Sequence, residues 1–150
     1  MLVRHGETVD NANRIMQGQT QGQLNETGIR QAEEVAISLA GEHVDAVVSS
    51  DLKRSYDTAC IIANKHGLDV STTKLLRERD WGSFTGRYIP DLKEEKWPDD
   101  IESLDHLLYR AKIFLDFVRS EYRDHSVVAV GHGIINKAIQ AVYYKVTMSE

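Results

Sequence analysis

Two arginines and two histidines are the residues of this chain best suited to chemistry on a phosphoryl group. Arg4 and His5 are adjacent, Arg54 lies near the start of an expected helix, and His132 lies between two glycines. Planar guanidinium groups present paired donors that suit a phosphoryl or carboxylate group. The first turn of a helix adds free N–H groups and a dipole that favour an anion. Together these residues predict a small anion site.

A histidine placed among arginines is disfavoured in its charged form, because like charges repel. Such a histidine is neutral and nucleophilic near pH 7. His5 can then attack phosphorus while Arg4, Arg54 and His132 balance the charge of the transferring oxygens. Each of these residues taken alone is more often an ordinary surface or loop residue, so the hypothesis depends on their being brought together.

The leaving alcohol of such a reaction needs a proton, which calls for a carboxylic acid near the nucleophile. Glu78 is the candidate, in an irregular segment between two arginines. Glu7 and Asp80 are rival acids that rank below it.

Short apolar runs alternate with helical periods along the chain, which predicts an α/β fold: a three-layer α/β/α sandwich with a mostly parallel sheet. Strands are expected at 2–3, 46–48, 69–72 and 127–130, and helices at 27–40, 52–65, 104–122 and 134–144. Asp51 is expected to cap the helix at 52–65. In parallel sheets, ligands bind beyond the carboxyl ends of the strands, and this is where the arginines and histidines fall.

One domain over residues 1–150 is expected, with an irregular segment at about 82–105 inserted as a cover over the site. The aromatic residues of this region can either wall the substrate pocket or pack the cover onto the core, and the second role is favoured. They are Trp81, Phe84, Tyr88 and Trp97.

Composition limits the class of protein. The formal net charge of −5 argues against a nucleic-acid groove, and at first sight also against an anionic substrate. Net charge governs long-range steering, however, whereas a few residues in a cleft set the site, so a small phosphate ester remains compatible. The single cysteine, Cys60, and the absence of a long apolar run or a signal-peptide pattern predict a cytoplasmic protein that does not enter the membrane.

Five sequence motifs resemble those of the histidine phosphatase superfamily, whose members include cofactor-dependent phosphoglycerate mutases and broad-specificity phosphatases. In chain order they are LVRHGET at 2–8, with the Arg-His-Gly (RHG) core, QGQT at 17–20, SSDLKRSYDTA at 49–59, LRERDWG at 76–82 and VGHG at 130–133. The resemblance covers about residues 2–141. The chain differs from the family's usual pattern at its ends, with three residues before Arg4 and no closing strand before its end at Glu150.

The resemblance implies a phosphohistidine intermediate on His5, with Glu78 as general acid and then as the group that helps to activate water. It implies that Arg4, Arg54 and His132 hold the phosphoryl group. Three further residues would line the site: Asn11, Gln17 and Gly18. No metal or cofactor is expected, because the family needs none and the remaining histidines show no ligand spacing.

Three functions fit these residues. A phosphatase of small phosphate monoesters is favoured, because the segment available as a cover is shorter than in the mutases that the chain resembles, and a mutase must shield its phosphohistidine from water. A cofactor-dependent phosphoglycerate mutase is the alternative, and a non-catalytic phosphate-binding domain is the third. The partner is expected to be a small phosphate ester, and the protein a monomer or homodimer, without nucleic-acid or membrane partners.

Overall fold

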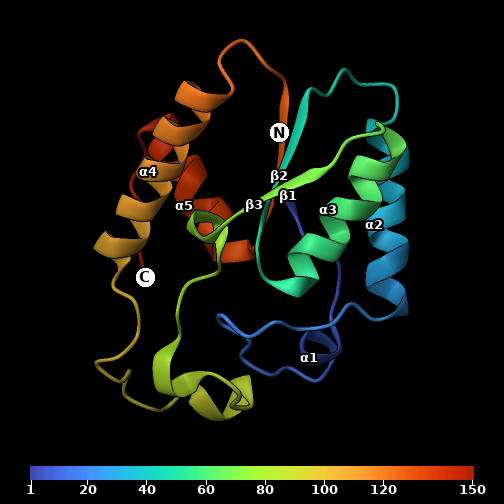
Figure 1. Cartoon of the computed structure of the whole chain (residues 1–150). Helices are drawn as coiled ribbons and strands as arrows, with labels where there is room; N and C mark the ends of the chain where they lie inside the picture. Colours follow the sequence, from blue (N-terminus) through green and yellow to red (C-terminus); the bar gives the residue numbers. More distant parts are fainter.

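The computed structural model describes residues 1–150 and is built on a sheet of four strands with helices on both faces (Figure 1). The strands are β1 (Leu2–Arg4), β2 (Ala46–Ser50), β3 (Val70–Thr73) and β4 (Val127–Gly131). Their spatial order is β1-β4-β2-β3, and every neighbouring pair is parallel. The central strands are buried on both faces, as expected of strands covered on both sides. The predicted α/β class is confirmed.

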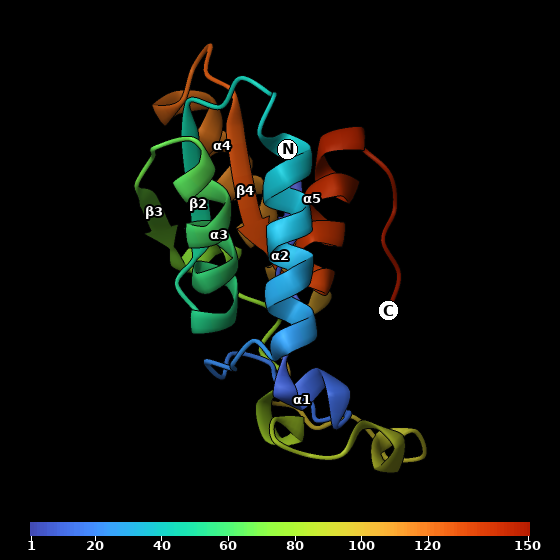
Figure 2. The same ribbon diagram turned by 90° about the vertical axis from the view of Figure 1, so that its right-hand side faces the viewer.

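Two layers of helices enclose the sheet. Helices α2 (Glu26–Leu39) and α3 (Lys53–Lys65) lie side by side on one face, as Figure 2 shows, and bury one apolar cluster with β2 and β4. Helices α4 (Leu104–Glu121) and α5 (Gly133–Tyr144) cover the other face and bury a second cluster around Phe114 and Leu107. None of the helices combines the length and apolar character needed to cross a membrane.

Two regions lie below the carboxyl ends of the strands in both views (Figures 1 and 2). One holds the short helix α1 (Val9–Ala12), which the sequence did not predict. The other region is residues 82–103, which we call the cover. It contains 3-10 turns at Gly82–Phe84 and Ile89–Leu92, and it ends where α4 begins at Leu104. Both regions are placed where they can border a site at this edge of the sheet.

The predicted cap at Asp51 is wrong. The N-cap residue of α3 is Leu52, and the backbone N–H groups of Lys53 and Arg54 donate instead to Gln21. The Asp51 carboxylate accepts two hydrogen bonds of 2.7 Å from Arg77. A bidentate pair with an arginine is stronger than a cap made to a neutral N–H, so the remote partner wins.

The glycine of the RHG motif has a packing reason. A Cβ on Gly6 would collide with the backbone of Gly28 in the first turn of α2, and a Cβ on Gly28 would collide with the backbone of Glu7. The chain segment that follows β1 therefore packs backbone to backbone against α2. This contact fixes the position of His5, the residue before Gly6.

Candidate active site

Three parallel strands deliver the predicted residues to one edge of the sheet. Arg4 is the last residue of β1 and His5 follows it, Arg54 lies in the first turn of the helix after β2, and His132 follows β4. The His5 and His132 rings meet edge to face with their centroids 5.0 Å apart. The structure therefore brings these residues together at the carboxyl ends of the strands, the edge at which parallel sheets bind ligands.

His5 is held in one tautomer, with one ring nitrogen unprotonated. Its Nδ1 lies 2.6 Å from the carbonyl oxygen of Gly6. A carbonyl can only accept, so Nδ1 carries the proton and Nε2 has the lone pair. The pKa of His5 is lowered to about 4, mainly because its ring is buried and also because Arg54 and Arg4 are near, against the opposing effect of the Gly6 bond. The ring is thus neutral at physiological pH.

His132 is completely buried, and one of its ring nitrogens lacks a hydrogen-bond partner. Its Nε2 lies 2.9 Å from the hydroxyl of Ser50, whereas its Nδ1 has no hydrogen-bond partner. Burial, followed by the nearby charges of Arg54, lowers the pKa of His132 well below its ordinary value. A buried ring nitrogen without a partner is rare in folded proteins, and it points to a ligand group that completes it.

Arg54 is a buried charge without a carboxylate partner. It is 1% exposed and forms no salt bridge. Its Nε–H donates to Nε2 of His5 at 3.3 Å, its Nη2 donates to the carbonyl of Gly18 at 2.7 Å, and its Nη1 donates to the carbonyls of Thr20 and Gln21. Burial lowers its pKa to about 10, so it remains a cation. Glu78 and Asp10 are near enough to oppose this lowering of the pKa, but neither forms a salt bridge with Arg54. Buried charges are usually paired, so a bound anion would complete this site.

A polar pocket of about 340 Å³ opens beside these groups and is lined by Arg4, His5, Glu7, Asn11 and Gln31. Arg4 is exposed, and its guanidinium lies against Gly133 at the start of α5. Asn11 accepts a hydrogen bond from the N–H of Thr8, which fixes it at the pocket wall. The structure thus brings Arg4 and Asn11 to the same pocket as His5.

Gln17 and Gly18 belong to the loop that Arg54 holds. Gln17 is buried and accepts a hydrogen bond of 2.8 Å from the hydroxyl of Thr8. Gly18 has a φ of +51°, in the left-handed region that favours glycine, and this turns its carbonyl to Arg54. Both residues therefore lie beside the predicted site.

Glu78 lies at the N-terminus of α5. Its Oε2 accepts from the N–H of Ile134 at 3.1 Å, and its Oε1 accepts from the N–H of Ile135 at 3.0 Å and from that of Arg79 at 2.9 Å. The side chain of His132 does not cap this helix, so Glu78 satisfies N–H groups that would otherwise lack partners. These hydrogen bonds hold the carboxyl group of Glu78 against the backbone of Ile134 and Ile135, which follow His132 in the chain.

The rival acids occupy different places. Glu7 lines the polar pocket with His5 and accepts a hydrogen bond from Asn25. Asp80 is exposed and accepts from the N–H of Gly82.

Several supporting residues escaped the sequence analysis. Ser50 contacts His132, and Thr58 accepts from the N–H of Gly6 while it donates to the carbonyl of Arg54. Gln21 caps α3 from the loop that Arg54 holds. The signal in the sequence that could have suggested such roles is the run of hydroxyl residues within 49–59. The structure buries four of them, Ser49, Ser50, Ser55 and Thr58.

The favoured expectation, that the aromatic residues of this region pack the cover onto the core, is not confirmed, because none of them belongs to the two apolar clusters that flank the sheet. Trp81 and Trp97 meet edge to face, and the guanidinium of Arg79 lies 5.1 and 5.3 Å from their ring centroids. Phe84 is buried beneath Arg87. None of these rings lines the polar pocket that contains His5.

The four remaining histidines lie outside this cluster. His43 pairs with Asp45 and His106 pairs with Glu102. No group of three or more histidine, cysteine, aspartate or glutamate side chains is arranged to hold a metal ion.

We expect a ¹⁵N NMR titration to show His5 neutral, with its proton on Nδ1, down to about pH 4. Because this pKa lies below the roughly 6.5 of an unfolded histidine, the unfolded chain binds the extra proton first. The contribution of His5 to stability is therefore present above about pH 6.5 and lost as the pH falls towards 4. A His5 midpoint near the roughly 6.5 of a free histidine, or a proton on Nε2, would contradict the assignment.

Comparison with known proteins identifies the family of the chain. The family model described as "Histidine phosphatase superfamily (branch 1)" matches residues 1–150. The chain belongs to the histidine phosphatase superfamily. Phosphoserine phosphatase 1 of Hydrogenobacter thermophilus is 33% identical over all of this chain and 78% of its own length. A probable phosphoglycerate mutase, GpmB, of Yersinia pestis is 46% identical over 64% of this chain, a match that spans only 46% of that protein.

Solved structures of this superfamily share the fold. A mycobacterial glucosyl-3-phosphoglycerate phosphatase superposes with a TM-score of 0.85 at 30% identity, over 97% of this chain and 79% of that protein. The relatives thus include proteins named as phosphatases and a protein named as a mutase.

Proposed function

We propose that the protein hydrolyses small phosphate monoesters through a phosphohistidine on His5, without a metal ion. The observation that carries this proposal is the buried guanidinium of Arg54, which has no carboxylate partner and donates its Nε–H to the unprotonated Nε2 of His5. A phosphoryl group bound at this point supplies the missing negative charge. Its oxygens accept the Nε–H of Arg54 in place of Nε2, which frees the lone pair of His5 to attack phosphorus.

In the first step, Nε2 of His5 forms a bond to phosphorus while the bond from phosphorus to the ester oxygen breaks. Glu78, in its acid form, gives a proton to that oxygen, so a neutral alcohol leaves. Arg54 and Arg4 balance the charge of the phosphoryl oxygens, and the open Nδ1 of His132 completes their hydrogen bonds.

In the second step, water attacks phosphorus while the bond from phosphorus to Nε2 breaks. Glu78 takes the proton from the water, which returns His5 to its starting state and releases inorganic phosphate. Asn11, Gln17 and Gly18 shape the wall of the site and hold the loop against Arg54.

Hydrolysis is favoured over a mutase reaction by the cover. A mutase must exclude water while the phosphohistidine waits for its acceptor. Most residues of the cover are exposed, and its Arg87 pairs with Glu95 of the cover itself and not with the pocket. We infer that residues 1–150 act as one domain with the cover as an insertion at 82–103.

The substrate is proposed to be small. Two relatives bear the names of phosphatases for phosphoserine and for glucosyl-3-phosphoglycerate, and both names describe phosphate esters of small organic molecules. The pocket of about 340 Å³ and the net charge of −5 of the chain suit such a compound better than a polyanion.

We expect phosphate release from a panel of small esters that includes phosphoserine and 3-phosphoglycerate, each assayed with the wild type and with His5→Ala. With 3-phosphoglycerate, hydrolysis should exceed isomerisation whether or not 2,3-bisphosphoglycerate is added. The similarity to the probable mutase of Yersinia pestis gives the alternative outcome. Isomerisation faster than phosphate release would establish a mutase, and binding of phosphate without any turnover would establish a binding domain.

A further inference from the structure

The segment that carries Glu78 contains little regular structure. It follows a single 3-10 turn at Lys74–Leu76 and runs without helix or strand through residues 77–81. Backbone carbonyls in such a segment need partners from elsewhere. The position of an acid in this segment therefore depends on groups outside it.

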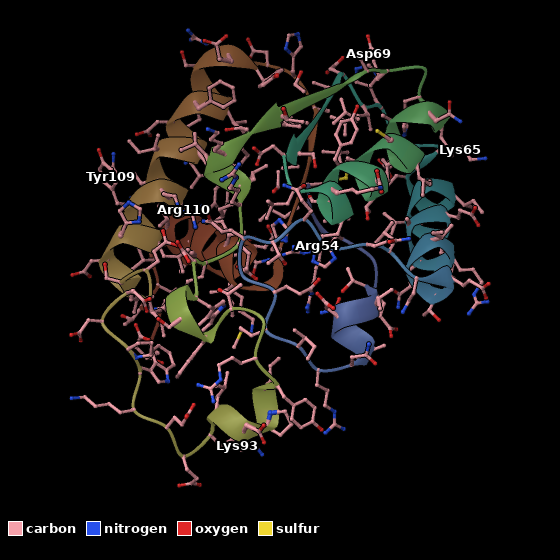
Figure 3. All side chains as sticks on the ribbon, turned by 60° about the horizontal axis from the view of Figure 1, so that its bottom comes forward. Arg54, Lys65, Asp69, Lys93, Tyr109 and Arg110 are labelled. Atoms are coloured by element: carbon pink, nitrogen blue, oxygen red, sulfur yellow. The ribbon has the colours of Figure 1, made fainter.

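One side chain of α4 supplies these partners. Nη1 of Arg110 donates to the carbonyls of Leu75 at 2.9 Å and Arg77 at 2.8 Å, and Nη2 donates at 3.3 Å to the carbonyl of Glu78, which also accepts from Nε2 of Gln19 at 3.1 Å. Figure 3 shows Arg110 on the inner side of α4, whereas the labelled neighbour Tyr109 points outward. A single guanidinium thus spans the segment up to the acid.

Glu102 holds Arg110 in this orientation. Its two carboxylate oxygens accept from Nε at 2.8 Å and from Nη2 at 2.9 Å, and the side chains of Glu102 and Arg110 are only 5% and 12% exposed. Burial acts to raise the pKa of Glu102, but the hydrogen bonds from Arg110 and Asp80 outweigh it, and the pKa lies below its ordinary value. The pair is therefore ionised and rigid.

Glu102 also binds the far side of the same segment. Its Oε1 accepts from the N–H of Asp80 at 3.0 Å, its N–H donates to the carbonyl of Asp80 at 2.8 Å, and its carbonyl accepts from Nε of Arg79 at 2.8 Å. Glu78 is thus fixed from both sides by Arg110 and Glu102, while its own carboxylate contacts α5.

We propose that Arg110, oriented by Glu102, is the positioning residue of the acid Glu78. This inference rests on the proposed function, in which Glu78 protonates the leaving oxygen. Arg110 lines a different pocket from His5, together with Glu102 and Arg77, so it acts through the backbone of Glu78 and not on the phosphoryl group.

The proposal predicts an effect that depends on the leaving group. An alkyl phosphate loses a strongly basic alkoxide and needs a proton in the first step, whereas p-nitrophenolate leaves without one. A displaced Glu78 therefore slows the first reaction more than the second. The value of kcat/KM is the right measure, because it reports the steps up to the loss of this first leaving group.

The test compares Arg110→Met with the wild type on β-glycerophosphate and on p-nitrophenyl phosphate. General acid catalysis contributes roughly 10²–10⁴-fold, so partial misplacement of the acid is expected to lower kcat/KM for the alkyl ester by about 10- to 100-fold. The value for the aryl ester should change several-fold less. Arg110→Lys should not restore the alkyl reaction, because one ammonium group cannot span three carbonyls and pair bidentately.

Phe114→Leu is the matched control for lost stability, because Phe114 is buried on the same helix and belongs to the apolar core. It should affect both esters equally. Glu102→Gln is the second variant, and it tests the proposal if Arg110→Met does not fold. It should also lower kcat/KM for the alkyl ester more than for the aryl ester. An equal loss on both esters, or no loss on either, would overturn the proposal.

Glu78→Gln separates this proposal from the proposed function. If Glu78→Gln shows the selective loss and the Arg110 and Glu102 variants do not, only the positioning role is wrong. If Glu78→Gln shows no dependence on the leaving group, the assignment of the acid itself fails.

Discussion

Replacement of His5 by alanine is expected to lower kcat by about 10⁴-fold or more, because it removes the only group from which a phosphoenzyme can form. The other histidine at this edge, His132, is completely buried; its Nε2 contacts Ser50, and the proposed mechanism uses its Nδ1 to hold a phosphoryl oxygen and not to attack phosphorus. Phosphate release from p-nitrophenyl phosphate measures the loss. A residual activity within tenfold of the wild type would contradict the mechanism.

His43→Ala is the matched control for this measurement. His43 is exposed, pairs with Asp45 and lies outside the polar pocket, so its loss should leave kcat unchanged. Binding of inorganic phosphate to His5→Ala adds a second check, because Arg54 and Arg4 remain and should still hold the anion. If His5→Ala neither folds nor binds phosphate, the same measurements are made on His5→Asn, which keeps a polar group near Gly6.

Replacement of Glu78 by glutamine is expected to lower kcat/KM for alkyl phosphates by roughly 10²–10⁴-fold and to change that for p-nitrophenyl phosphate far less. The amide keeps one oxygen to accept from the N–H groups of α5 but has no proton to give. The amide NH2 group cannot accept from the remaining N–H, so any loss of stability has to be measured separately from the chemical loss. Thermal unfolding of the variant checks this point.

Asp80→Asn and Glu7→Gln are the controls for Glu78, because they remove the two rival acids in the same way. Asp80 faces solvent and should have little effect. Glu7 lines the pocket and can change the affinity for substrate, but not the dependence on the leaving group. A selective loss on alkyl esters in either control, and not in Glu78→Gln, would assign the acid to that residue.

The location of the site was accessible from sequence because it depends on a rule of topology. Once the strands are expected to be parallel, their carboxyl ends share one edge, and Arg4, His5 and His132 must meet there. The placement of Arg54 followed from the helix after β2. These inferences need only the alternation of strands and helices, which local periodicity reveals.

The contacts that refine the site could not be predicted in this way, since they join residues far apart in the sequence. Asp51 carries the local signal of a helix cap, yet Arg77 takes its carboxylate and Gln21 caps the helix. Arg110 lies beside the apolar stripe of α4, and nothing near it in the sequence shows that it binds the carbonyls of residues 75–78. Local propensity does not encode such long-range competition for hydrogen bonds.

The measurement that tests the central claim most directly is the capture of the phosphoenzyme. Glu78→Gln is mixed rapidly with p-nitrophenyl phosphate, quenched in alkali, where phosphohistidine survives, and digested for mass spectrometry. The first step proceeds because the leaving group needs no proton, whereas the second step is slow because Glu78 no longer activates water. We predict a burst of p-nitrophenol and one phosphoryl group on Nε2 of His5. Turnover without any adduct on His5, or an adduct on His132 instead, would contradict the account.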